Sequence, residues 1–83
     1  MALFMDVHSL GGPLGLSDAE QAHAADLRTQ SRYGVNYLRY WVDAKQGKIF
    51  CLVEAPDAEA AASVHSEAHG LVADEIYLVQ EGS

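Results

Sequence analysis

Apolar residues alternate with polar ones, or run together, in several short stretches of this chain, a pattern typical of β-strands. From residue 2 to residue 8 the side chains alternate, so that Leu3, Met5 and Val7 point one way and the residues between them the other. The stretch from 35 to 43 is aromatic and β-branched, which also favours a strand. We predict strands over residues 2–8, 35–43, 48–55 and 75–80.

Helix signals lie between these strands. Ser17 followed by Glu20 has the spacing of a capping box, so a helix is expected from Ser17 to about Ser31. Asp57 is a favoured N-cap, and the alanine-rich helix that follows it should end at Gly70. The order β-α-β-β-α-β predicts an α+β, ferredoxin-like fold: a four-stranded antiparallel sheet with both helices on one face.

This architecture leaves the second face of the sheet bare. Along the stretch 35–43 both sides are bulky, with Arg39 and Trp41 on one side and Tyr40 and Val42 on the other. A sheet with a single buried face needs only one apolar set of side chains. We therefore predict a homodimer packed sheet against sheet, a dimeric α/β barrel. The alternative is that the aromatic side chains pack on loops or stay partly exposed.

Length, charge and cysteine content narrow the function. The 83 residues form one domain, 1–83, whose thin core also favours dimerisation. A net charge of −7 with only five Lys and Arg residues argues against a nucleic-acid partner. No apolar run is long enough to span a bilayer and no signal peptide is evident, so no membrane partner is expected. The single cysteine, Cys51, fits a reducing compartment and a cytoplasmic protein.

Three pairs of residues have the spacing of metal ligands. Side chains two apart on a strand, or three to four apart on a helix, share one face and can bind one ion. The pairs are Asp6 with His8, His65 with His69, and His23 with Asp26. The competing interpretation is a strand end bonded to loop backbone for the first pair and solvated helix faces for the other two. Cys51 is expected to be a small buried core residue, with a ligand role as the alternative.

The topology brings two of these pairs toward the same end of the domain. The first strand ends at the sheet edge where the first helix begins, and the second helix runs back toward that edge. His8 and the pair His65–His69 should therefore lie near one another. The orientation of the strand is left open: if Leu3 and its alternate residues face the helices, Asp6 and His8 point to the open face and form a separate site at the dimer interface.

The residue types limit the chemistry of such a site. Imidazoles with carboxylates suit nickel, zinc, copper or cobalt, and the absence of a Cys-x-x-Cys motif argues against structural zinc bound by thiolates. No catalytic constellation is evident, because nothing marks Cys51 as an activated nucleophile. The glycine-rich stretch 11–15 also lacks the spacing of a phosphate-binding loop.

The pattern as a whole resembles a family of small bacterial nickel-binding proteins with a dimeric ferredoxin-like fold. The resemblance spans nearly the entire chain. It is carried by Met5-Asp-Val-His8, Ala22-His-Ala-Ala-Asp-Leu27, Tyr40-Trp-Val-Asp43, Phe50-Cys-Leu-Val-Glu-Ala-Pro56 and His65-Ser-Glu-Ala-His-Gly-Leu71. It implies a homodimer that binds Ni²⁺, and related ions such as Zn²⁺ or Co²⁺, rather than an enzyme.

Three functions compete at this point. The first is a cytoplasmic nickel-binding protein for metal buffering, storage or delivery. The second is a small dimeric α/β-barrel enzyme, a monooxygenase or isomerase, with His8 as acid or base in a cavity lined by Tyr37, Tyr40, Trp41 and Tyr77. The third is a structural module that binds a partner protein. A cavity large enough for an organic molecule would favour the enzyme.

Overall fold

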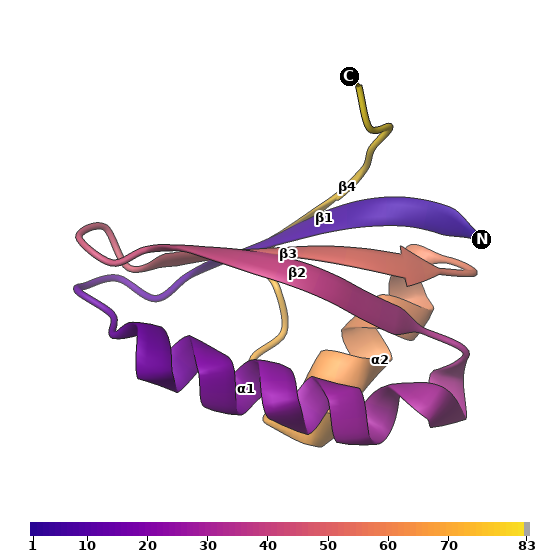
Figure 1. The fold of residues 1–83 in the computed structure, drawn as a ribbon, viewed down its shortest axis with the longest axis horizontal. Helices are drawn as coiled ribbons and strands as arrows, with labels where there is room; N and C mark the ends of the chain where they lie inside the picture. The colour runs from indigo at the N-terminus through magenta and orange to yellow at the C-terminus, as the bar shows by residue number, and fades with distance from the viewer. Residues whose placement is uncertain (83) are drawn as a thin grey trace.

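The protein was analysed as a computed structural model that describes residues 1–82; Ser83, at the end of the expected domain, lies outside them. The elements follow the predicted order, with a short 3-10 helix added after the first helix (Figure 1). The strands are β1 (Ala2–Ser9), β2 (Asn36–Asp43), β3 (Lys48–Ala55) and β4 (Glu75–Leu78). The helices are α1 (Leu16–Thr29), the 3-10 helix (Gln30–Tyr33) and α2 (Ala58–Ala68).

All the strands join one antiparallel sheet in the order β2-β3-β1-β4. β1 pairs with β3 along its whole length, from Ala2 opposite Ala55 to Ser9 opposite Lys48. Both helices lie on the same side of this sheet, as Figure 1 shows. This strand order with helices on one face is the ferredoxin-like fold, so the predicted fold class is confirmed.

The second helix begins as predicted. The Asp57 carboxylate accepts a hydrogen bond of 2.8 Å from the backbone N–H of Ala60, which satisfies one of the free donors at the start of α2. The helix ends before Gly70, which has a positive φ of 77° that favours glycine.

The predicted capping box of the first helix is wrong. α1 begins at Leu16 with Gly15 as its N-cap, and no side chain caps it, so Ser17 already lies inside the first turn. The preceding loop explains the shift: the Leu14 N–H donates to the Ala44 carbonyl at 2.9 Å. This bond ties the loop to the β2–β3 hairpin and fixes where the helix can begin.

Strand β2 contains a β-bulge that changes which side chains share a face. Tyr37 lies opposite Val53 and Arg39 opposite Leu52, so Leu38 is an extra residue. Tyr37 and Tyr40 consequently both face the helices, whereas simple alternation predicts opposite sides. The apolar pattern could not reveal the bulge because both sides of this strand are bulky.

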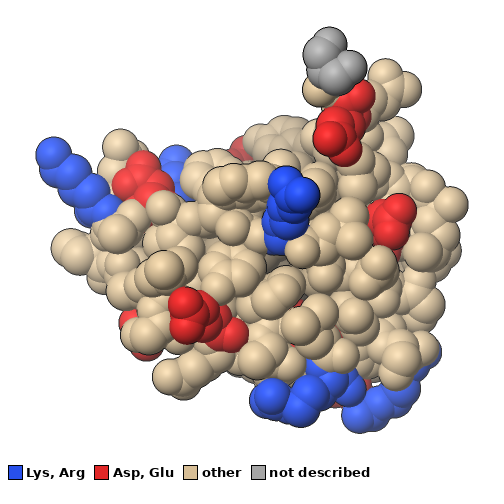
Figure 2. Space-filling view, in the orientation of Figure 1, with Lys and Arg blue, Asp and Glu red and all other residues tan. Residues whose placement is uncertain are grey.

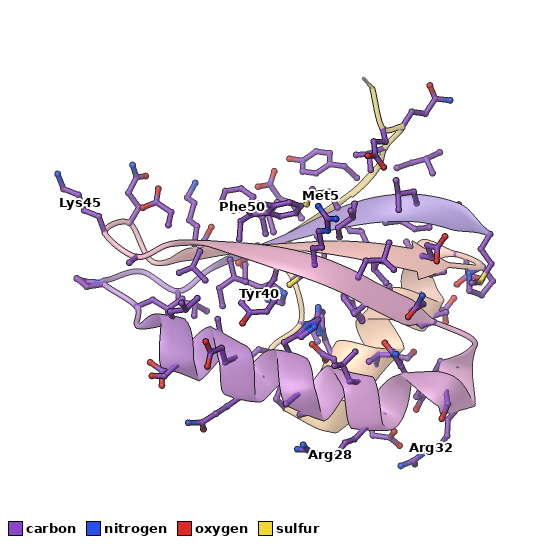
Figure 3. The ribbon with its side chains drawn as sticks, viewed as in Figure 1. Met5, Arg28, Arg32, Tyr40, Lys45 and Phe50 are labelled. Carbon is purple, nitrogen blue, oxygen red and sulfur yellow. The ribbon has the colours of Figure 1, made fainter. Side chains whose placement is uncertain are left out.

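The core lies between the sheet and the helices, while the other face of the sheet is open. Tyr40 points toward α1, and Met5 and Phe50 point away from the helices (Figure 3). On the open face Trp41 is 47% exposed and Tyr77 is 48% exposed. A groove of about 430 Å³ lies there, lined by Leu3, Met5, Arg39, Trp41, Leu52 and residues 79–81.

Charged side chains are scattered over the face shown in Figure 2, and the Lys and Arg side chains lie in several separate places on it. Among the described residues, no helix is both long and apolar enough to cross a membrane.

Candidate metal centre

Strand β1 directs Asp6 and His8 toward the helices. Asp6 pairs with Cys51 of β3 and Ile76 of β4, and it is 0% exposed; His8 is 4% exposed. The reversed orientation, which would send this pair to a separate site on the open face, is wrong. Apolar residues occupy both sides of the strand, so alternation could not choose between the orientations; in the structure Phe4 provides the core contact.

His65 lies at the centre of a buried cluster, between two carboxylates from different elements. Its Nδ1 donates to Asp26 Oδ1 of α1 at 2.9 Å, and its Nε2 donates to Asp6 Oδ2 of β1 at 3.0 Å. Carboxylates only accept hydrogen bonds, so both ring nitrogens carry protons and His65 is an imidazolium. The side chains of all three residues are buried.

Burial and charge oppose each other in this cluster. Burial by itself lowers the pKa of His65, but hydrogen bonds to Asp26 and Asp6 outweigh it and raise that pKa to about 9. Burial raises the pKa of the Asp6 carboxyl, whereas the hydrogen bonds from His65 and Tyr37 and the nearby His8 ring hold that pKa well below its usual range. The Tyr37 hydroxyl donates to Asp6 Oδ2 at 2.8 Å, and burial and the Asp6 charge raise its pKa.

His69 lies in the same cluster as His65. Its ring lies 5.0 Å from that of His65, as the helical spacing predicts, and its Nε2 is 3.0 Å from Asp26 Oδ1. Its Nδ1, however, accepts a hydrogen bond of 3.1 Å from the Leu71 N–H. Because Nδ1 accepts this bond, the ring proton sits on Nε2, and burial lowers the pKa of His69. That nitrogen has no free lone pair for an ion, although its N–H is poorly aligned with Asp26.

One carboxylate oxygen in the cluster lacks a hydrogen bond. Asp6 Oδ1 is buried and has no partner in bonding geometry, although His8 Nε2 lies 3.2 Å away. The ligand atoms of Asp6, His8, Cys51 and His65 all lie within 4.8 Å of one another. Leaving a buried carboxylate oxygen unsatisfied is costly, and a cation bound among these atoms would remove that cost.

The cavity beside this cluster is small. Its volume is about 20 Å³, enough for one water-sized particle, and its lining includes His8, His23, Cys51 and His69. An organic substrate needs a pocket of roughly 300 Å³ or more, so the space between the helices and the sheet does not provide the predicted enzyme cavity. The groove of about 430 Å³ lies on the open face, and His8 does not line it. The four aromatic residues expected to line that cavity are divided: Tyr37 and Tyr40 face the helices, while Trp41 and Tyr77 lie on the open face.

His23 and Asp26 do not form the predicted pair. Asp26 turns toward His65 and His69, whereas the His23 ring stacks beside Tyr40 with ring centres 4.8 Å apart. His23 lines the cavity but belongs to neither of the two potential ligand groups in residues 1–82. His23 therefore lies near the candidate metal site but is not one of its potential ligands.

The donors present fit a divalent transition metal. The two overlapping groups are Asp6, His8, Cys51 and His65, and Asp26, His65 and His69. Ligand atoms bound to one ion at about 2.0–2.3 Å lie at most about 4.2–4.6 Å apart, close to the spacing of these groups. Their imidazoles and carboxylates suit nickel, zinc or cobalt. Each group contains one buried polar atom without a hydrogen bond, Asp6 Oδ1 in the first and His69 Nε2 in the second.

Two members of the cluster escape sequence reasoning. The apolar pattern assigns Cys51 to the core, and only the β1–β3 register, which sets it opposite Asp6, reveals its neighbours. Simple alternation assigns Tyr37 to the opposite side of its strand, because the bulge is not visible in the sequence. The only signal that could have identified Cys51 is its position opposite Asp6 in the paired strands, because side chains opposite each other point to the same face of the sheet.

The chain is similar to known proteins along nearly its whole length. A protein-family model described as "Nickel responsive protein SCO4226-like" matches residues 4–79. The crystal structure of SCO4226 from Streptomyces coelicolor A3(2) superposes with a TM-score of 0.91 at 40% sequence identity. The match covers 99% of this chain and 100% of that one. No curated protein matched the chain.

Proposed function

The chain belongs to the SCO4226-like family of nickel-responsive proteins, and we propose that it binds Ni²⁺ in the buried cluster around Asp6. Its role is to buffer, store or deliver the metal in the cytoplasm. The observation that carries the proposal is the buried Asp6 Oδ1, which has no hydrogen bond and lies among the side chains of His8, Cys51 and His65.

The protein's own residues prepare this site for a cation. Asp6 and Asp26 place two carboxylates around one imidazolium, so the buried cluster favours additional positive charge. Tyr37 and Asp26 hold Asp6 and His65 in place through hydrogen bonds of 2.8 and 2.9 Å. When a metal binds, the proton between His65 Nε2 and Asp6 Oδ2 must leave, because a metal ligand needs the nitrogen lone pair.

Calorimetric titration of chelator-stripped protein with Ni²⁺, Zn²⁺ and Co²⁺ tests the proposal. We expect Ni²⁺ to bind the wild type, and we expect His8→Ala and His65→Ala each to abolish or strongly weaken binding. His23→Ala is the matched control, because His23 lines the same cavity but lies outside both ligand groups. It should bind Ni²⁺ as the wild type does.

The outcomes separate the candidate sites. Equal loss in His8→Ala and His65→Ala supports one shared site, whereas loss in His65→Ala alone would move the site to Asp26 and His69. Absence of Ni²⁺ binding by verified metal-free wild type would overturn the proposal.

We further propose that the protein forms a homodimer through the open face of its sheet. The support is the exposure of Trp41 and Tyr77 beside the apolar residues Leu3, Met5 and Leu52. A second copy of the same face would remove these side chains from water. Sedimentation velocity at micromolar concentration should give the mass of a dimer, and a monomer throughout would contradict this assignment.

A further inference from the structure

Cys51 occupies an unusual position for a residue of the core. It lies in the middle of β3, directly opposite Asp6 of β1, and its side chain faces the helices at 6% exposure. Side chains directly opposite on paired strands have Cβ atoms about 5 Å apart. The thiol is therefore held against a buried carboxylate, an arrangement that an ordinary apolar core position does not require.

A second feature points independently to a ligand at this place. Asp6 Oδ1 is completely buried and has no hydrogen-bond partner, while the other oxygen, Oδ2, accepts from His65 and Tyr37. The Cys51 sulfur lies within 4.8 Å of Asp6, His8 and His65 ligand atoms, and it also lines the small cavity. The unpaired oxygen and the sulfur thus belong to one group of potential donors.

The other ligand group of the cluster is less suited to an ion. The Leu71 N–H bond to His69 Nδ1 keeps the proton of this neutral ring on Nε2, the nitrogen nearest Asp26. Asp26 Oδ1 also already accepts from His65 Nδ1. Asp26 therefore serves to hold His65, and the donor atoms of Asp26 and His69 are less free to bind an ion than those of Asp6, His8 and Cys51.

We propose that Cys51 is a metal ligand, binding Ni²⁺ as a thiolate together with Asp6, His8 and His65. This inference rests on the proposed nickel binding and adds a sulfur donor to it. On binding, the S–H bond of Cys51 breaks, a sulfur–metal bond forms, and the proton leaves to solvent. In the metal-free protein, burial and the Asp6 charge raise the pKa of the thiol, so it stays protonated until a cation arrives.

Absorption spectroscopy of chelator-stripped protein titrated with Ni²⁺, and with Co²⁺ as a second probe, tests the sulfur donor directly. Thiolate-bound ions give sulfur-to-metal charge-transfer bands in the near ultraviolet, which imidazole and carboxylate ligands do not. We expect the wild type to develop these bands at one equivalent of metal. Cys51→Ser and Cys51→Ala should lack the bands and bind more weakly, by more than the roughly 10- to 100-fold that outer-shell partners cost.

Folding and binding controls keep the result unambiguous. Far-ultraviolet circular dichroism checks that the metal-free variants fold. If they do not, the wild-type absorption spectrum still tests whether sulfur binds the metal, because Cys51 is the single cysteine of the chain. Calorimetric binding without charge-transfer bands would overturn the role of Cys51 and leave the proposed function standing. Absence of any binding to the wild type would overturn both.

Discussion

The two faces of the sheet differ in an unexpected way: charged side chains are buried within the core on one face, and aromatic side chains are exposed on the other. On the helix-covered face, Asp6, Asp26 and His65 are at most 2% exposed. On the open face, by contrast, Trp41 and Tyr77 keep nearly half of their surface in contact with solvent. A small domain has little apolar surface to bury, so placing charge inside and aromatic residues outside costs stability on both faces.

The two faces of the sheet therefore have different roles. On the covered face a polar cluster occupies part of the core, while two large aromatic side chains, Trp41 and Tyr77, lie on the other face. If the open face is covered by a second copy, the dimer restores the apolar burial that the cluster removed. The two proposals therefore support each other: a buried metal site is easier to maintain in a dimer than in a monomer.

The largest expected effect on the free energy of unfolding comes from Asp6→Ala, which removes a carboxylate from the buried cluster on the helix-covered face. This change leaves the His65 imidazolium with one carboxylate, and it leaves the Tyr37 hydroxyl with the Ala61 carbonyl as its remaining acceptor. Removing one member of a buried ion pair costs about 3–5 kcal/mol. Urea unfolding of the metal-free protein should show a loss of this size.

The matched control for Asp6→Ala is the exposed pair of Arg32 and Glu67, whose side chains are 67% and 36% exposed. Because exposed pairs contribute roughly 0–1 kcal/mol, Glu67→Gln should change the free energy of unfolding very little. Similar losses in both variants would show that the buried cluster is energetically no different from a surface pair.

The second largest effect should come from pH, which changes the charge of the buried cluster and therefore the free energy of unfolding. The pKa of His65 is raised from 6.5 to about 9, so its stabilising effect is fully present below about pH 6.5 and is lost as the pH rises toward 9. The pKa of Asp6 is lowered from 3.8, so its contribution is present above about pH 4 and is lost in acid. Metal-free protein should therefore be most stable between about pH 4 and 6.5 and decline above that range.

Urea unfolding at a series of pH values measures this profile. In Asp6→Ala the decline above pH 6.5 should shrink, since His65 has lost one of the two carboxylates that raise its pKa. A wild-type profile that stays flat between pH 6.5 and 9 would contradict the assignment of His65 as a buried imidazolium.

Asp26→Asn should have a smaller effect, on binding rather than on folding. Asparagine keeps the shape of the side chain and can still accept from His65 Nδ1, but it removes the negative charge. Outer-shell partners of metal ligands typically contribute 10- to 100-fold in affinity. Calorimetry should therefore find Ni²⁺ binding weakened by about that factor, whereas complete loss would make Asp26 a ligand itself.

The fold is predictable because each element carries its own local signal. The Asp57 cap, the glycine stops and the alternation along β1 and β3 each favour one structure, and together they determine the strand order. The start of α1 is not predictable, since a tertiary hydrogen bond from Leu14 to the β2–β3 hairpin, rather than Ser17, places it.

The candidate site is predictable only in part. The spacing of His65 and His69 and of Asp6 and His8 correctly nominates members of the cluster. Their arrangement depends on strand register and on rotations of side chains across the core, which local spacing does not contain. That is why spacing alone pairs His23 with Asp26, and why it leaves Cys51 in the core.

The smallest expected effect on folding lies on the open face, at Trp41. Its ring is 47% exposed and lines the groove rather than the core, so Trp41→Ser should change the stability of the isolated monomer by no more than about 1 kcal/mol. Its effect on the dimer should be much larger, since buried aromatic residues dominate interfaces. The melting temperature of the wild type should therefore rise with protein concentration, and that of Trp41→Ser should not. If both proteins melt independently of concentration, the open face is not covered by a second copy, and the exposure of Trp41 and Tyr77 needs another explanation.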